Sequence, residues 1–370
     1  MKRLKSIDSF RGLFIIEMIW VHAVGWWLVT SDLWLSFFTI PYIDRTGGPG
    51  FIFVAGLSVT LYVRSRRLKA KNSDTYSDQM IKNEYFLRAL LLFIFSISIN
   101  IGVAIMYNDI SQIWTWFIIL NITVSLFLAW PLLKTSKLTR LVIAMLGWIA
   151  NYLLFHILSP HEGQFNLFGV LFHFLFNSIE MDPLFFGFSF LLIGTVIGDQ
   201  IFDIYQIDNQ DERRLALKNK LLLPSIIIGA ILIIPSIING HDKPYHIASF
   251  PWIFFSLGVN LIMLAVLLGF EEFELIKTEK SYRFLYYFSF YSLTIYVAHD
   301  LLYFVFLGQL HWYNIYFFVI ITIILVFLLI KAIYHSKWRN YPSIKLQIGR
   351  IASGLTMRIE ERKKIKNSSQ

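Results

Sequence analysis

The chain has 370 residues, of which 56% are hydrophobic and 15% are charged, and its formal net charge is +9. Soluble globular chains carry about 25% charged residues, so this composition excludes an ordinary soluble domain and favours repeated membrane spans. The chain contains no cysteine, which excludes disulfides, thiol nucleophiles and thiolate metal sites.

Ten apolar runs approach the ~20-residue length that crosses a bilayer as a helix. In chain order they cover residues 12–30, 49–63, 86–107, 113–133, 141–158, 184–204, 221–238, 250–270, 284–307 and 313–334. The apolar stretch Phe165–Phe176 is shorter and fits a re-entrant or interfacial segment. The Gly47–Gly50 stretch predicts a tight turn before the second run. We therefore expect an all-α fold, a polytopic membrane helix bundle with about ten transmembrane helices.

The basic residues predict the orientation of this bundle, because cytoplasmic loops are enriched in Lys and Arg. If both chain ends are cytoplasmic, two of the 33 basic residues, Arg45 and Lys243, lie outside, and the remaining 31 lie inside. The positive charge is then a topology signal, and no nucleic-acid partner is expected. We expect a membrane domain over residues 1–335 and a basic amphipathic cytoplasmic tail over 336–370.

The first span carries three ionisable side chains, Arg11, Glu17 and His22. Eleven residues at 100° each bring Arg11 and His22 to one helix face, about 16 Å apart along the axis, whereas Glu17 points elsewhere. Ionisable groups within a membrane are costly and are functional candidates for that reason. The structural alternative is a snorkelling Arg11 and a His22 that bonds a neighbouring helix.

The ninth run places Ser292, Tyr296 and His299 on one helix face. Counted from the inner end, His299 lies at a depth comparable with that of His22. Two histidines at similar depth on different helices can line one cavity, and a satisfied polar pair between helices is the open alternative.

Four segments in chain order resemble the transmembrane acyltransferase superfamily, and in particular its heparan-α-glucosaminide N-acetyltransferase-like branch. They are Ser6–Leu13 with His22 after it, Gly48–Ser58, Asp182–Gly194 and Ser292–His299. The opening, in which ten residues separate Arg11 from His22, also resembles the acyltransferase-3 family.

The resemblance implies a transferase that moves an acetyl group from cytoplasmic acetyl-CoA to an amine or hydroxyl of a sugar or glycan beyond the membrane. By position, it implies catalytic roles for Asp8, Arg11, His22 and His299. The family's lysosomal glucosamine acetyltransferase has Asn at the position of His22 and its active histidine in the following outer loop. This sequence has no histidine between His22 and His156, so His22 is the expected base here.

Basic residues at the inner mouth suit the phosphates of CoA. We expect Arg11, Arg64, Arg67 and Arg88 to bind this co-substrate, with Ser292 and Tyr296 as hydrogen-bond donors near the acyl group. No metal is expected.

Two other functions stay open from the sequence. A proton- or solute-coupled transporter would use Glu17, His22 and His299 as a relay, and a scaffold would need neither histidine. The cell membrane is the expected location, and a homo-oligomer is left open.

Overall fold

The protein is described by a computed structural model that covers residues 3–71, 77–177, 182–238, 249–275 and 282–368, without the side chains of 37–45 and 364–368. Lys243, one of the two basic residues predicted to lie outside, is not among the described residues, and the side chain of Arg45, the other, is not described. The chain divides into two compact units. Unit 1 comprises Met1–Phe51, Ile207–His246 and Phe250–Gln347, and unit 2 comprises Ile52–Gln206, Ile247–Ser249 and Ile348–Gln370.

The described chain is helical throughout, apart from loops and one isolated bridge between Leu28 and Leu310. Seven described helices are long and apolar enough to cross a membrane. Many of their apolar side chains are exposed on the surface of the protein, where they suit contact with lipid. The protein is thus an all-α, multi-pass membrane protein, as the composition predicts. The total of about ten spans and the cytoplasmic location of both chain ends stay predictions.

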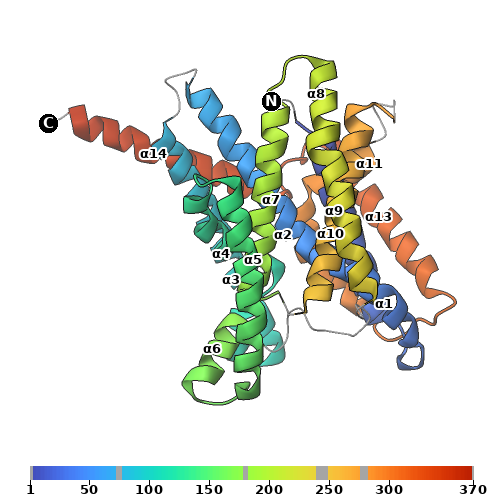
Figure 1. The fold of residues 1–370 in the computed structure, drawn as a ribbon. Helices are drawn as coiled ribbons and strands as arrows, with labels where there is room; N and C mark the ends of the chain where they lie inside the picture. The colour runs from blue at the N-terminus through green and yellow to red at the C-terminus, as the bar shows by residue number, and fades with distance from the viewer. Residues whose placement is uncertain (1–2, 72–76, 178–181, 239–248, 276–281, 369–370) are drawn as a thin grey trace. The chain divides into compact units, whose positions relative to one another are not determined.

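Unit 1 is built from the N-terminal helix and from helices between residues 207 and 347 (Figure 1). Its elements are α1 (Lys5–Trp27), the start of α2 (Trp34–Lys71), α8 (Gln210–Leu217), α9 (Leu223–Ile238), α10 (Phe250–Glu272), α11 (Arg283–Phe290), α12 (Ser292–Ala298), the 3₁₀ helix η5 (His299–Phe304) and α13 (Ile315–His335). A π-helical turn, Lys218–Leu222, joins α8 to α9. Helices α9 and α10 lie side by side (Figure 1), and residues of α1, α11 and α13 form one apolar core.

Unit 2 contains the rest of α2 and most of the tail helix α14 (Ile344–Ser368). Between them in sequence come α3 (Asp78–Tyr107), α4 (Ile118–Leu132), α5 (Lys137–Leu158), α6 (Leu167–Leu175) and α7 (Leu184–Ile204). At nine residues, α6 is about 14 Å long and too short to span the bilayer. Its apolar side chains are exposed, and a re-entrant or interfacial position for it stays a prediction.

Two predicted local features are wrong. The expected turn at Gly47–Gly50 does not exist, because α2 continues through these residues. The ninth run is not one helix: the backbone breaks at Tyr291, between α11 and α12, and tightens into η5 at His299.

Close backbone contact joins α2 to α7 in unit 2. A Cβ added to Gly56 would lie 2.0 Å from the carbonyl oxygen of Leu191, and one added to Gly194 would lie 2.1 Å from that of Phe53. Small residues let membrane helices approach in this way, and Gly194 begins a Gly-x-x-x-Gly pattern that ends at Gly198.

Gly194→Ala should therefore destabilise the protein, because the added methyl group meets backbone that cannot move aside. Overpacking of this kind costs about 1–3 kcal/mol. The measurement is the midpoint of thermal unfolding in detergent. Gly102→Ala, in open space on α3, is the control, and it should leave the midpoint unchanged or raise it. An equal midpoint for both variants would contradict the close α2–α7 contact.

Candidate active site

His22 of α1 and His299 at the end of α12 meet within unit 1. Nδ1 of His22 lies 2.8 Å from Nε2 of His299, and the ring centroids are 4.7 Å apart. His299 is 5% exposed, and His22 is half-buried. The similar depths predicted from the sequence correspond to direct contact between the two side chains.

The hydrogen bonds around His299 determine which nitrogens carry protons. Nδ1 of His299 faces the backbone carbonyl of Tyr296, which can only accept, so this nitrogen donates. In a neutral His299 the Nε2 atom is then an acceptor, and His22 donates to it from Nδ1. A neutral His22 consequently keeps its lone pair on Nε2.

An acidic side chain and an aromatic ring complete the surroundings of the pair. The Asp300 carboxylate lies 3.5 Å from Nε2 of His299, where it can stabilise positive charge after the pair takes up a proton. The Trp26 ring meets the His22 ring edge-on at 4.9 Å and stacks on the His299 ring at 5.8 Å. Trp26 therefore limits the rotation of both imidazoles.

Backbone pairing at the end of α1 holds the two histidines together. The last carbonyls of a helix lack partners within it. Those of Trp26 and Trp27 accept hydrogen bonds from the N–H groups of Gly308 and Leu310, at 2.9 and 2.7 Å. The Trp27 indole also donates to the Leu302 carbonyl at 2.7 Å. These bonds fix η5, which begins at His299, against the end of α1, which carries His22.

Asp8 and Arg11 form an ion cluster near the start of α1. Arg3 binds both oxygens of Asp8, at 2.6 and 3.1 Å, and Arg11 lies 3.4 Å from the same carboxylate. Arg11 and Asp8 also bond the hydroxyl of Ser289, at 3.2 Å each. Since the cluster is about 16 Å along α1 from His22, the structure does not bring these residues to the histidines.

Ser292 and Tyr296 both belong to α12, as their shared face predicts. Ser292 is buried, and Tyr296 is half-buried with its ring centroid 5.7 Å from that of His299. Tyr296 is thus close to the histidines through both its ring and its backbone carbonyl.

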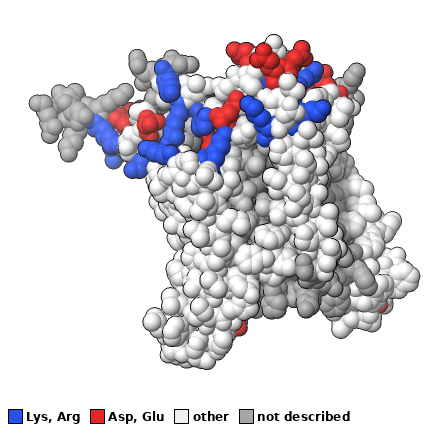
Figure 2. All heavy atoms as spheres, in the orientation of Figure 1, with Lys and Arg blue, Asp and Glu red and all other residues white. Residues whose placement is uncertain are grey.

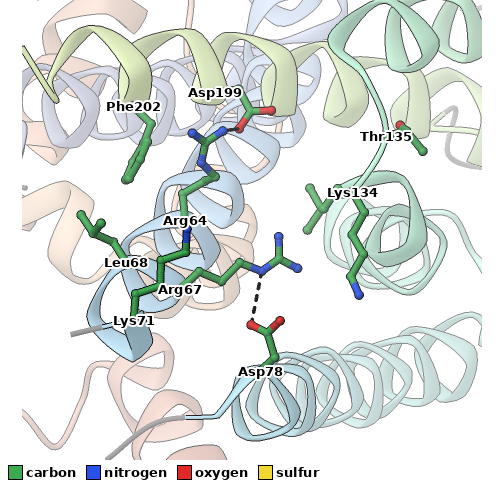
Figure 3. Close-up of a pocket in the computed structure, with 10 residues that line it drawn as sticks. Arg64, Arg67, Leu68, Lys71, Asp78, Lys134, Thr135, Asp199 and Phe202 are labelled. Atoms are coloured by element: carbon green, nitrogen blue, oxygen red, sulfur yellow. Dashed lines mark hydrogen bonds and ion pairs between the residues drawn. The ribbon is translucent and has the colours of Figure 1, made fainter. Parts of the chain in front are cut away.

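In unit 2, Arg64 and Arg67 line a cavity of about 660 Å³. Figure 3 shows both side chains projecting from α2, with Lys134 facing them from the turn after α4. Lys71, Asp78 and Asp199 complete the charged lining, and Leu68, Leu133, Thr135 and Phe202 complete the wall. Arg64 bonds Asp199 at 2.9 Å, and Arg67 lies 3.7 Å from Asp78.

The lining has four basic and two acidic side chains. This excess of positive charge suits an anionic ligand, and the volume is within the range of about 300–1,000 Å³ typical of ligand pockets. Figure 2 shows Lys and Arg gathered at the end of unit 2 where α2 terminates and α3 begins, the end predicted to be cytoplasmic.

Arg88 does not line this cavity. It bonds Glu84 at 2.5 Å and stacks over the Tyr62 ring at 4.6 Å. Lys71 and Lys134, which do line it, were not among the sequence candidates. The sequence did place both lysines near the predicted cytoplasmic ends of the second and fourth apolar runs. The enrichment of Lys and Arg in cytoplasmic loops was enough to explain that position, so neither lysine was singled out as a binding residue.

The family model for the heparan-alpha-glucosaminide N-acetyltransferase catalytic domain matches residues 3–234, or 232 of the 370 residues. The chain belongs to this family. The heparan-alpha-glucosaminide N-acetyltransferase match includes His22, Arg64 and Arg67 and ends before the segment with His299. The protein is therefore a multi-pass membrane acetyltransferase. No curated protein matches the chain.

Asp32, in the loop after α1, should make the stability of the contact between this loop and Trp312 depend on pH. The Trp312 backbone N–H, 3.0 Å from the carboxylate, and the His311 ring at the same distance hold the pKa of Asp32 below its usual range. A lowered folded-state pKa gives stability that is present above the unfolded value of about 3.9 and is lost as the pH falls through the folded value. We expect hydrogen exchange at the Trp312 amide, corrected for intrinsic rates, to increase below about pH 4. Asp32→Asn should abolish this pH dependence, and an equal response in both proteins would contradict the contact.

Proposed function

We propose that this acetyltransferase moves an acetyl group from cytoplasmic acetyl-CoA to the amine or hydroxyl of a sugar or glycan on the other side of the membrane, with His22 as the base. The observation that carries the proposal is the 2.8 Å contact between His22 and His299. Family membership favours this reading over a transporter.

The proposed role of His22 is to accept the N–H or O–H proton of the sugar on Nε2 as the sugar attacks the thioester carbonyl. The new N–C or O–C bond forms, the C–S bond breaks, and the proton passes on to the CoA thiolate, which leaves as the free thiol. An imidazole is suited to this transfer because its ordinary pKa is near neutrality. His299 then orients His22 through the Nδ1 hydrogen bond, as the Tyr296 carbonyl orients His299. Asp300 offsets the positive charge that the pair gains. This order of base, orienting group and second orienting group follows the logic of catalytic triads.

The cavity in unit 2 is the proposed site for the phosphates of CoA. Arg64, Arg67, Lys71 and Lys134 supply donors that match phosphate oxygens. Phe202 and Leu68 offer an apolar surface beside them. When bound, acetyl-CoA supplies an acetyl group activated as a thioester. The roles of Arg11 and Asp8 are then to stabilise the start of α1, and Ser292 and Tyr296 remain candidates for contact with the acyl group.

His22→Ala should lower kcat by about 10²–10⁴-fold, the usual contribution of a positioned general base. The assay uses the full chain in vesicles, acetyl-labelled acetyl-CoA outside, and a panel of amino sugars and neutral sugars inside. His156→Ala, which removes an exposed histidine of α5, is the matched control and should retain activity. A folded His22→Ala protein with full activity would rule out His22 as the base. Solute flux without acetyl-CoA consumption would favour the transporter.

Lys134→Ala should raise the Kd for CoA about 10- to 150-fold, because one charge-assisted hydrogen bond is worth about 1.5–3 kcal/mol. The rate at saturating acetyl-CoA should change little, since this side chain only binds the phosphates. The measurement is calorimetric titration with CoA, and Lys69→Ala, an exposed lysine of α2 outside the cavity lining, is the control. Equal affinity in the two variants would place the CoA phosphates elsewhere.

A further inference from the structure

The C-terminal segment Arg339–Lys345 crosses the break in the helix that leads to His299. Helix α11 ends at Phe290 and α12 begins at Ser292. The Tyr291 N–H bonds the carbonyls of Tyr287 and Ser289, and further carbonyl capacity at this helix end is open to outside donors. Unpaired backbone groups at membrane depth cost several kcal/mol, and broken membrane helices are tolerated where neighbouring groups bind them.

The tail supplies such donors on the α11 side of the break. The Ser343 hydroxyl donates to the Phe290 carbonyl at 3.0 Å, and Lys345 Nζ donates to the Ser289 carbonyl at 2.7 Å. Ser343 is 1% exposed. In the reverse direction, the Tyr291 hydroxyl donates to the Arg339 carbonyl at 2.8 Å.

On the α12 side, Thr294 makes a two-way link to the same segment. Its hydroxyl donates to the Pro342 carbonyl and accepts the Ile344 N–H at 3.2 Å. The tail therefore binds the end of α11, the residue at the break and the first turns of α12.

The angle between α11 and α12 controls where His299 lies. Helix α12 has seven residues and is about 10 Å long. If α12 tilts by about 6° about its N-terminal end, which the tail binds, its C-terminal end moves by about 1 Å. His299 follows directly after that C-terminal end. A displacement of that size can reduce catalysis about 10²-fold when reacting groups must meet in one geometry.

We propose that Arg339–Lys345 is a positioning element for the acetyl-transfer site: Ser343 and Thr294 set the angle of α12 and so hold His299 against His22. The proposal rests on the proposed function, in which these histidines act on the acceptor. Thr294 and Ser343 are positioning residues and touch no substrate. The segment thereby couples the C-terminal tail to the reaction, since a change that detaches it alters the angle of α12.

The test compares Thr294→Val, which removes the hydroxyl at nearly constant volume, with Thr294→Ser, which keeps it. The control is Thr356→Val, a buried threonine of α14 whose hydroxyl bonds only the Ala352 carbonyl of its own helix among the contacts described. Each variant of the full chain is measured for kcat, for KM of acetyl-CoA, and for hydrogen exchange over residues 292–304.

We expect Thr294→Val to lower kcat about ten- to hundredfold, with KM for acetyl-CoA within about twofold and faster exchange over 292–304. Thr294→Ser should recover most of the rate, and Thr356→Val should behave as the unmodified protein. Ser343→Ala, on the tail side of the contact, should reproduce the Thr294→Val effects. In a His299→Ala background, Thr294→Val should cause little further loss, because coupled residues are not additive.

Unchanged exchange over 292–304 and unchanged kcat in both Thr294→Val and Ser343→Ala would overturn the proposal. So would a loss of equal size with and without His299, because the segment would then act independently of the histidine. Exchange is measured without substrate. Faster exchange in Thr294→Val would therefore support the role of Arg339–Lys345 in positioning α12. If His22→Ala and His299→Ala kept full activity at the same time, the histidine mechanism alone would be refuted.

Discussion

The contact between His22 and His299 depends on backbone groups that find partners outside their own helices. In a membrane, every N–H and C=O must be bonded within the protein. The end of α1 satisfies this requirement by pairing with residues 308–310, and this pairing places η5 beside α1. At the break beside Tyr291, the carbonyls of Phe290 and Ser289 accept hydrogen bonds from Ser343 and Lys345 of the C-terminal segment. The hydrogen bonds that stabilise the irregular backbone thus also determine the position of the imidazoles.

Discontinuous helices give the site its geometry. A straight helix through the ninth apolar run would place its residues at fixed steps of 100° and 1.5 Å. The break and the 3₁₀ turn free His299 from those steps and let Tyr296 offer its carbonyl to the ring. Irregular backbone near functional groups is common in membrane proteins, because it lines cavities that a regular helix would close.

Charge has two roles in the chain. At the end of unit 2 where α2 terminates, basic side chains mark the predicted cytoplasmic face, and four of them also line a cavity. In unit 1, the cations Arg3 and Arg11 are occupied by Asp8 and Ser289. Sequence counting treats all of these residues alike. Their partners distinguish a cation that stabilises a helix end from one that faces an open cavity.

The sequence by itself determined the fold class, most of the helical segments and the family, because spanning length, charge and motif spacing are local or additive properties. It also identified His22 and His299 as candidates, since both are ionisable groups within apolar runs. Only the tertiary structure decided that they touch, that Arg88 lies away from the cavity, and that Lys71 and Lys134 line it. The turn expected at Gly47–Gly50 failed because packing partners, not local propensity, decide whether a helix continues in a membrane. The link from Ser343 and Thr294 to His299 was equally inaccessible, because it joins residues distant in sequence through bonds to a helix break that no periodicity reveals.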